Sequence, residues 1–230
     1  MQPHLAQGRP RRAFTLIELL VVLAVLGVLA SIILPAVGNV QTKARQAAAQ
    51  SDLRSIALGY NTFALGGSRI RSIGAGAWSA GATTAATTGE WAQVLAEFAD
   101  LNSGTLYFVS SAPDVATMAE IPAVILNGND RPTADWSSQT GNLSYEAAVG
   151  LPAGAPASLT PLVWTKGLQA DGTWADDSPW EGAGGHIAFL DGHVTFYENT
   201  ENQLTNPDTG ARETDIAAVV TAAGGDVVEP

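Results

Sequence analysis

The chain has 230 residues, no cysteine and a formal net charge of −11. Without cysteine, neither a disulfide framework nor a thiolate metal site can form. Beyond residue 13, eight basic side chains stand against 22 acidic ones, which argues against nucleic acid as a partner because such binding needs a basic footprint.

The first predicted element is an apolar helix that follows a basic leader. Arg9, Arg11 and Arg12 precede a run of about 19 residues, 16–34, that is apolar except for Glu18 and two small residues. The run is long enough to span a bilayer and longer than the apolar core of a secretory signal peptide. Because arginine-rich flanks stay in the cytoplasm, we expect a single pass through the inner (cytoplasmic) membrane. The rest of the chain, including the globular head expected over residues 66–230, should then lie outside the cytoplasm.

The helical pattern continues beyond the apolar run. Apolar residues recur at steps of three and four, which predicts one amphipathic helix from Phe14 to about Ala64, roughly 75 Å long. Pro35 removes a backbone donor and is expected to kink this helix. The apolar stripe comprises Val37, Val40, Ala44, Ala47, Leu53, Ile56, Ala57, Tyr60 and Phe63.

Glu18 is the residue that a plain anchor does not need. A carboxylate that faces hydrocarbon costs about 2.5–3.5 kcal/mol even on lenient insertion scales. The sequence around it, RRAFTLIELLVVLAVLGVLASIILPAV (11–37), resembles the N-terminus of type IV prepilins and of the pseudopilins of type II secretion.

This resemblance implies a processing and assembly mechanism. In that family, prepilin peptidase removes a basic leader before a phenylalanine and the new amine is methylated, which places the cut between Ala13 and Phe14. Glu18 corresponds to the assembly carboxylate and Pro35 to the kink. The family usually has glycine before the cut. Since Ala13 is also small, we expect processing to survive, but more slowly or by a less strict peptidase.

The physical chemistry of the N-terminus is consistent with this role. Cleavage creates an α-amine in or near the membrane, where an unpaired ammonium and an unpaired carboxylate are both costly. If Glu18 of one subunit meets the Phe14 amine of another copy or a related pilin-like subunit, each relieves the other's penalty. A buried pair of this kind is a good device for setting register between subunits.

Two other interpretations of the N-terminus stay open. Glu18 could reach the membrane interface from a plain anchor, or the arginines could belong to a twin-arginine export signal that is cut near residues 28–30. A proton-relay role is disfavoured because a single span gives Glu18 no partner.

Residues 66–230 are expected to form one head. Residues 66–89 are rich in Gly, Ala, Ser and Thr and predict a loop. The further predicted elements are a short helix over 90–100 capped by Thr88, strands over 105–110, 143–149 and 161–165, and a short helix near 213–222.

The clearest local prediction in the head is a β-hairpin over 186–197. Asp191-Gly192 indicates a two-residue type I′ turn, which would pair Leu190 with His193. In that register His186 and His193 share a face roughly 13 Å apart, too far to chelate one zinc ion. The residues expected on the core face are Ile187, Phe189, Val194 and Phe196.

The C-terminal part also resembles a known group. PLVWTKGL, DGTW and DDSPWEGAGGHIAFLDGHVTFY are similar to the end of many prepilin-like bacterial proteins, which finish in a glycine-rich loop and a DG hairpin. That group implies no activity for the head. We expect Trp174 and Trp180 to pack in the core or the loop rather than to form a sugar platform.

An acidic loop suggests a metal. Asp171, Asp176, Asp177 and Glu181 offer hard oxygen ligands that suit calcium, and major pseudopilins that this chain resembles use a calcium-stabilised C-terminal loop. Calcium at Asp171, Asp176 and Asp177 is therefore a hypothesis, and the alternative is a solvated acidic loop.

Together these features predict an α+β, pilin-like protein in which a long kinked N-terminal helix, membrane-spanning in its first half, packs on a small antiparallel sheet. The predicted parts are a leader (1–13), a membrane and filament-core helix half (14–35), an amphipathic half (36–65) and the head (66–230). We expect a non-enzymatic subunit of a type IV pilus-like or type II secretion filament. The alternative is a membrane-anchored or exported module, outside the cytoplasm, that binds glycan or calcium without forming a filament.

Overall fold

The structure is a computed structural model that describes residues 14–230, apart from the side chains of residues 33–37 and 39. An N-terminal helix is followed by an antiparallel sheet, in agreement with the predicted α+β class. The leader and Ala13 lie outside the described residues. The chain divides into two compact units, residues 1–44 and 45–230.

Helix α1 covers Leu16–Leu65, close to the predicted span. Its backbone stays helical through Pro35, and the kink expected there remains a prediction. Among the described residues, no helix has both the length and the apolar character needed to cross a membrane.

In the first unit, the large apolar side chains of α1 have no cover from the chain itself. Their exposed fraction runs from 48% at Val22 to 81% at Leu16, and Phe14, just before the helix, is 79% exposed. The stretch from Phe14 to Ile32 contains thirteen such side chains, on all sides of the helix.

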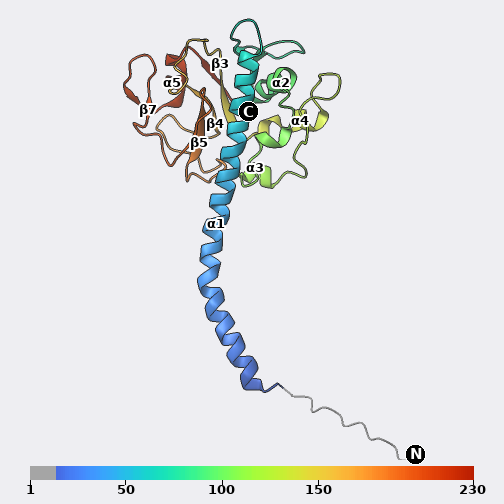
Figure 1. The fold of residues 1–230 in the computed structure, drawn as a ribbon, viewed down its shortest axis with the longest axis vertical. Helices are drawn as coiled ribbons and strands as arrows, with labels where there is room; N and C mark the ends of the chain where they lie inside the picture. Colours follow the sequence, from blue (N-terminus) through green and yellow to red (C-terminus); the bar gives the residue numbers. More distant parts are fainter. Residues whose placement is uncertain (1–13) are drawn as a thin grey trace, which may run out of the picture. The chain divides into compact units, whose positions relative to one another are not determined.

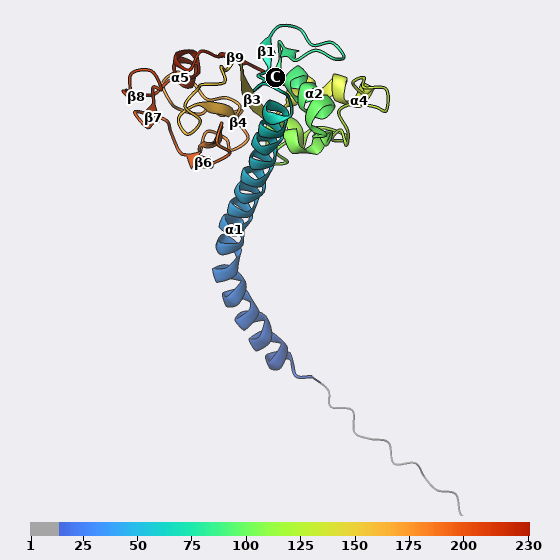
Figure 2. The same ribbon diagram turned by 45° about the horizontal axis from the view of Figure 1, so that its top comes forward.

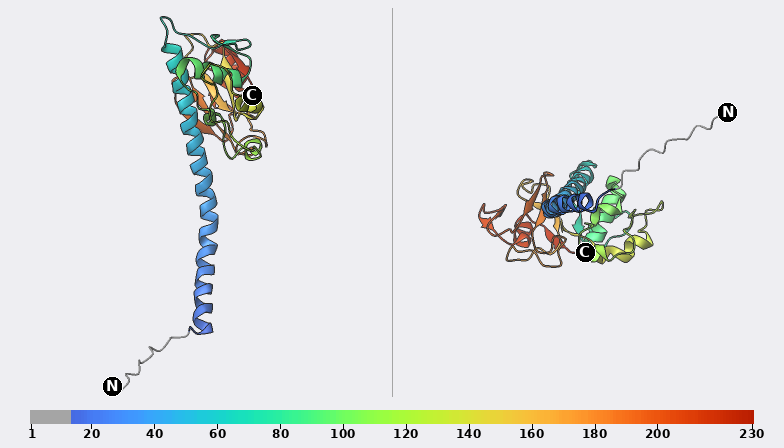
Figure 3. Two further views of the ribbon diagram at one scale, coloured as in Figure 1. Left: turned by 90° about the vertical axis from the view of Figure 1, so that its right-hand side faces the viewer. Right: turned by 90° about the horizontal axis from the view of Figure 1, so that it is seen from below.

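In the second unit, the end of α1 packs into the head, as the cyan segment shows (Figures 1 and 3). The predicted stripe is confirmed over Leu53, Ile56, Ala57, Tyr60 and Phe63, which are all buried. The prediction is wrong for Val40, Ala44 and Ala47, which are exposed, and Ala49 lies in the core instead. The side chain of Val37 lies outside the described residues. Tyr60 stacks on Trp91 of the next helix, with ring centroids 5.9 Å apart.

The head is built on one five-stranded sheet in the order β6-β5-β4-β3-β9, antiparallel throughout. Figure 2 shows β9 beside β3 and β6 at the opposite edge. Strands β3 and β4 fall within their predicted spans, whereas β9 was not expected. The strands are β3 (Tyr145–Val149), β4 (Pro161–Thr165), β5 (Gly185–Phe189), β6 (Val194–Tyr197) and β9 (Asp226–Val228).

Two helices of the head confirm their predictions. Helix α2 (Thr88–Ala99) is capped by Thr87, one residue before the expected cap, whose side chain accepts a hydrogen bond from the Glu90 N–H. Helix α5 (Ile216–Ala222) begins after Asp215, whose carboxylate caps it by accepting the Ala217 N–H.

The strand predicted over 105–110 is wrong. A 3-10 turn, η1 (Gly104–Tyr107), occupies its first half. Tyr107, Phe108 and Val109 are buried consecutively, so this apolar run marks a buried irregular segment rather than an alternating strand. The remaining elements are β1 (Gly74–Ala75), β2 (Thr84–Ala85), α3 (Pro113–Ala116), α4 (Ala134–Gln139), η2 (Thr140–Asn142), β7 (Leu204–Thr205) and β8 (Arg212–Glu213).

The β5–β6 hairpin is present, but its loop has three residues instead of two. The Phe189 N–H donates to the His193 carbonyl at 3.0 Å, and the Gly192 N–H donates back to the Phe189 carbonyl at 2.8 Å. Gly192 has a φ of 86°, the left-handed conformation that closes a three-residue hairpin loop. The carboxylate of Asp191 accepts the His193 N–H at 3.0 Å and supports the turn.

The longer loop shifts the predicted register by one residue. Ile187 pairs with Thr195 and not with Phe196, and such a slip moves side chains to the other face of a sheet. Phe196 therefore stands opposite His186 and not with Ile187. The predicted core face was wrong for β6, whose side chains are only half-buried or exposed.

Candidate functional site

The candidate site is the start of α1, where Thr15 and Glu18 bond to each other. The Thr15 N–H and its hydroxyl both donate to Glu18 Oε2 at 2.8 Å. The Glu18 N–H in turn donates to Thr15 Oγ1 at 3.3 Å. The Leu19 N–H donates to the Thr15 carbonyl at 3.3 Å, which makes Thr15 the residue that caps the helix.

This arrangement is a capping box. A threonine caps the first turn while a glutamate three residues later bonds back to the threonine backbone, so that two free N–H groups are satisfied. A carboxylate in the first turn also interacts favourably with the helix dipole. This role of Glu18 was not predicted, although Thr15-x-x-Glu18 is the spacing that signals it.

Phe14 lies outside the helix, immediately before the cap. Its ring is 79% exposed, and the α-amine expected to pair with Glu18 would exist only after cleavage at Ala13. Within one uncut chain, Glu18 is therefore bonded to Thr15, while Phe14 and the following apolar side chains stay uncovered.

The acidic loop does not bring its carboxylates together. Among the residues that the structure describes, no group of three or more His, Asp or Glu side chains is placed to hold a metal ion. Asp171 Oδ1 instead accepts the Thr173 N–H at 3.0 Å and the Thr173 hydroxyl at 2.6 Å. Asp171 thus stabilises its own turn, and the arrangement gives no support to a calcium site shared with Asp176 and Asp177.

The two hairpin histidines have separate environments. His193 is partly exposed, stacks on Phe189 with centroids 4.3 Å apart, and bonds to Asp191 at 2.5 Å. His186 is only 2% exposed, and burial lowers its pKa to about 4. In the observed register they point to opposite faces of the sheet, so they cannot share a ligand.

Trp174 and Trp180 pack inside the head. They are 4% and 7% exposed, which confirms the core assignment. A sugar platform would need an exposed ring face, which neither provides.

Glu146 is a carboxylate on β3 that the head largely encloses. It accepts the Trp164 indole N–H at 2.8 Å and the Gly167 N–H at 2.9 Å. Burial raises its pKa despite these bonds. Both carboxylate oxygens are occupied by structural donors, so Glu146 joins β3 to the end of β4.

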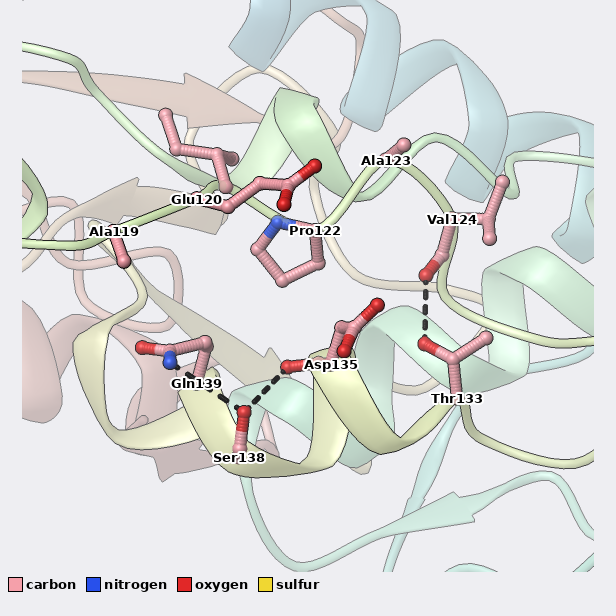
Figure 4. Close-up of a pocket in the computed structure, with 10 residues that line it drawn as sticks. Ala119, Glu120, Pro122, Ala123, Val124, Thr133, Asp135, Ser138 and Gln139 are labelled. Atoms are coloured by element: carbon pink, nitrogen blue, oxygen red, sulfur yellow. Dashed lines mark hydrogen bonds between the residues drawn. The ribbon is translucent and has the colours of Figure 1, made fainter.

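A surface pocket of about 240 Å³ lies between residues 119–124 and α4. Figure 4 shows Glu120 and Asp135 on either side of Pro122. Both carboxylates are exposed, and the Ser138 hydroxyl donates to the Asp135 carbonyl at 2.9 Å. The pocket therefore presents no nucleophile with an adjacent base, the pairing on which an active-site assignment would depend.

Comparison with known proteins bears on the N-terminus. Residues 8–34 match the prokaryotic N-terminal methylation motif, as in a type IV prepilin or pseudopilin-like signal. No curated protein and no solved structure matches the chain. The match contains Ala13, Phe14, Thr15 and Glu18, so it covers the whole candidate site.

Proposed function

We propose that this chain is the precursor of a pilin or pseudopilin, a structural subunit that assembles into a type IV pilus-like or type II secretion filament. One observation carries the proposal. The methylation motif ends in a helical segment whose large apolar side chains, from Leu16 to Ile32, are all exposed, and that segment starts with a bonded carboxylate.

Processing is the first step of the proposed function. Phe14 and Thr15 are not helical, and the helix begins only at Leu16. A prepilin peptidase would therefore meet a non-helical chain on the product side of the cut between Ala13 and Phe14. The Thr15 cap keeps the helix from extending into that segment, because it ends the ladder of backbone bonds there.

Assembly is the second step. Fully burying one large apolar side chain contributes about 1.5–3 kcal/mol, so burial of the uncovered apolar surface from Phe14 to Ile32 is strongly favoured. We propose that the inner membrane covers it first and the helices of other subunits cover it in the filament. The new amine of Phe14 then competes with Thr15 for the Glu18 carboxylate of a neighbouring subunit and sets the register.

The orientation follows from the charges. The arginines before the apolar run stay in the cytoplasm, which places the head in the periplasm or at the cell surface. The head forms the outer surface of the filament, and we assign it no enzymatic step.

The test is the intact mass and the N-terminal sequence of the protein recovered from membranes of its own host. A chain that begins at methylated Phe14 is the expected result. A chain that begins at Met1, or near Ser31 after cleavage by another peptidase, would leave Glu18 without its partner and overturn the proposal. An Ala13→Gly variant serves as the matched control, because restoring the usual glycine should speed processing without moving the cut.

A further inference from the structure

His186 occupies an aromatic cage on β5. Its ring meets Trp180 at a centroid distance of 5.9 Å and Phe196 at 5.0 Å, both edge-on. Its backbone N–H donates to Thr165 Oγ1 at 3.0 Å. The ring nitrogen Nδ1 is buried without a hydrogen-bond partner among the described residues, so the cage suits a neutral imidazole.

No opposite charge compensates a protonated ring there. Among the described residues His186 forms no ion pair, and burial lowers its pKa. The nearby ionisable side chains are Lys43, Arg45, Asp52 and Arg54 on α1, Lys166 after β4, Asp176, Asp177 and Glu181 in the preceding loop, and Tyr197 and Glu198 at β6. None of them forms an ion pair with His186.

Residues 174–184, which we call the aromatic loop, depend on this cage. Most of the loop's backbone bonds stay within the loop, such as Glu181 N–H to Ser178 and Ala183 N–H to Trp180. Its polar attachments to the rest of the head lie mainly at its start, where Trp174 forms a β-bridge with Leu168 and the Ala175 N–H donates to the Gly167 carbonyl at 2.8 Å. The Ser111 hydroxyl also donates to the Pro179 carbonyl at 3.4 Å. The other described contacts are made by rings: Trp180 on His186, and Trp174 against Gly185, where an added Cβ would lie 2.4 Å from the indole.

We propose that His186 is an acid-sensitive latch, whose protonation releases the aromatic loop from β5 while the rest of the sheet stays folded. A charged imidazolium in this cage would be buried and unpaired, which is costly. Moving the loop away admits water to the ring and removes that cost.

The direction of the effect follows from the two protonation states. The pKa is about 4 in the closed loop, against 6.5 for an unperturbed histidine. The stability of the closed loop relative to the open loop is therefore greatest above pH 6.5 and decreases as the pH falls toward 4. The ratio of open to closed loop should rise roughly tenfold per pH unit in this window.

Hydrogen exchange on the full chain in detergent micelles tests the latch. Protection of the aromatic loop, corrected for intrinsic rates, should fall about 100-fold between pH 7 and pH 4.5, while β3 and β4 keep theirs. His186→Gln should remove this pH dependence. His193→Gln, in the same hairpin but partly exposed, should leave it unchanged.

Three results would overturn the proposal. They are equal protection of the loop at both pH values, a fall that persists in His186→Gln, and a parallel loss of protection in β3 and β4, which would mean global unfolding. If circular dichroism shows that His186→Gln is unfolded near neutral pH, His186→Phe replaces it, because an apolar ring fits between Trp180 and Phe196. That variant should also show a loop insensitive to acid.

Discussion

The two ends of α1 are both rich in apolar residues, but these side chains are buried at one end and exposed at the other. From Leu53 to Phe63, apolar side chains fall on one stripe, and the chain's own head buries that stripe. From Leu16 to Ile32, apolar side chains surround the helix, and the chain covers none of them. Helix α1 thus contains one segment whose apolar side chains are buried by its own chain and another whose apolar side chains are not.

This difference predicts which property of the protein a substitution in each segment should change. Changes in the buried segment, 53–63, should alter the folding of a single subunit. Changes in the uncovered segment, 16–32, should leave folding intact and alter what the subunit joins.

The largest effect is expected from Glu18→Ala. The variant should insert into the membrane and fold its head normally, yet filament assembly in the host should fall at least about tenfold, because the new amine loses its register partner. Filaments sheared from cells and quantified by immunoblot measure this. Leu19→Ala is the control, since it removes apolar area at the next position without touching the carboxylate. If Glu18→Ala gave the same filament yield as the wild type, Glu18 would have no role in assembly beyond capping the helix.

Phe63→Ala should be the most destabilising change in the buried segment. The ring is fully buried against Phe98, at 6.1 Å, and under the Arg71 guanidinium, at 4.8 Å. Its loss should cost about 3–5 kcal/mol of unfolding free energy, measured by urea titration of tryptophan fluorescence in micelles. Leu58→Ala, on the same helix but 53% exposed, should cost less than about 0.5 kcal/mol. Equal costs would contradict the burial of this stripe.

Gly192→Ala tests the three-residue hairpin loop. An added Cβ would meet only Leu58 at 3.9 Å and Asn61 at 4.0 Å, so the cost is conformational, about 1–2 kcal/mol for an L-residue in the left-handed region. The same urea titration measures it. Gly154→Ala is the control, because nothing lies within 4 Å of its Cβ. A neutral Gly192→Ala would contradict the left-handed conformation that closes this loop.

The smallest effect is expected from Thr15→Val, which keeps the shape of the side chain and removes the capping hydroxyl. The first turn of α1 should lose about 1 kcal/mol, seen as faster hydrogen exchange over residues 15–20, while head stability stays unchanged. Ser31→Ala is the matched control, since its hydroxyl bonds only to the Val28 carbonyl within the helix. Unchanged exchange in Thr15→Val would show that the cap does not hold the helix start.

The elements that could be predicted from the sequence are those with strong local signals. The 3.6-residue period predicted α1 and its buried stripe, and compact apolar runs between glycines and prolines predicted β3 and β4. Prediction failed where the structure depends on distant contacts. Tyr107 to Val109 resembled a strand because burial on all sides hides the period. Strand β9 is formed by three residues that pair with Ala147, Ala148 and Val149 far away in the chain.

In the β5–β6 hairpin, one residue of loop length determines which side chain lies opposite His186. Asp191-Gly192 fits both a two-residue turn and the end of a three-residue loop, and only the second places His186 against Phe196. The motif at the N-terminus was predictable from the sequence, and the match over residues 8–34 contains Ala13, Phe14 and Glu18, whose roles in processing and assembly stay predictions. The bond between Thr15 and Glu18 was equally predictable from their spacing, but a charge within an apolar run suggests a membrane role before it suggests a helix cap.

The cap at the start of α1 also bears on reversibility. Thr15 provides two donors to Glu18, both to Oε2. An amine from another chain would either exchange with them or bond to Oε1, which accepts no bond among the described residues. In both cases the carboxylate stays bonded, and in the proposed assembly the apolar helix surface would supply the net drive. A subunit that leaves the proposed filament would bond Glu18 to Thr15 again, so its release leaves no unpaired carboxylate at the start of α1.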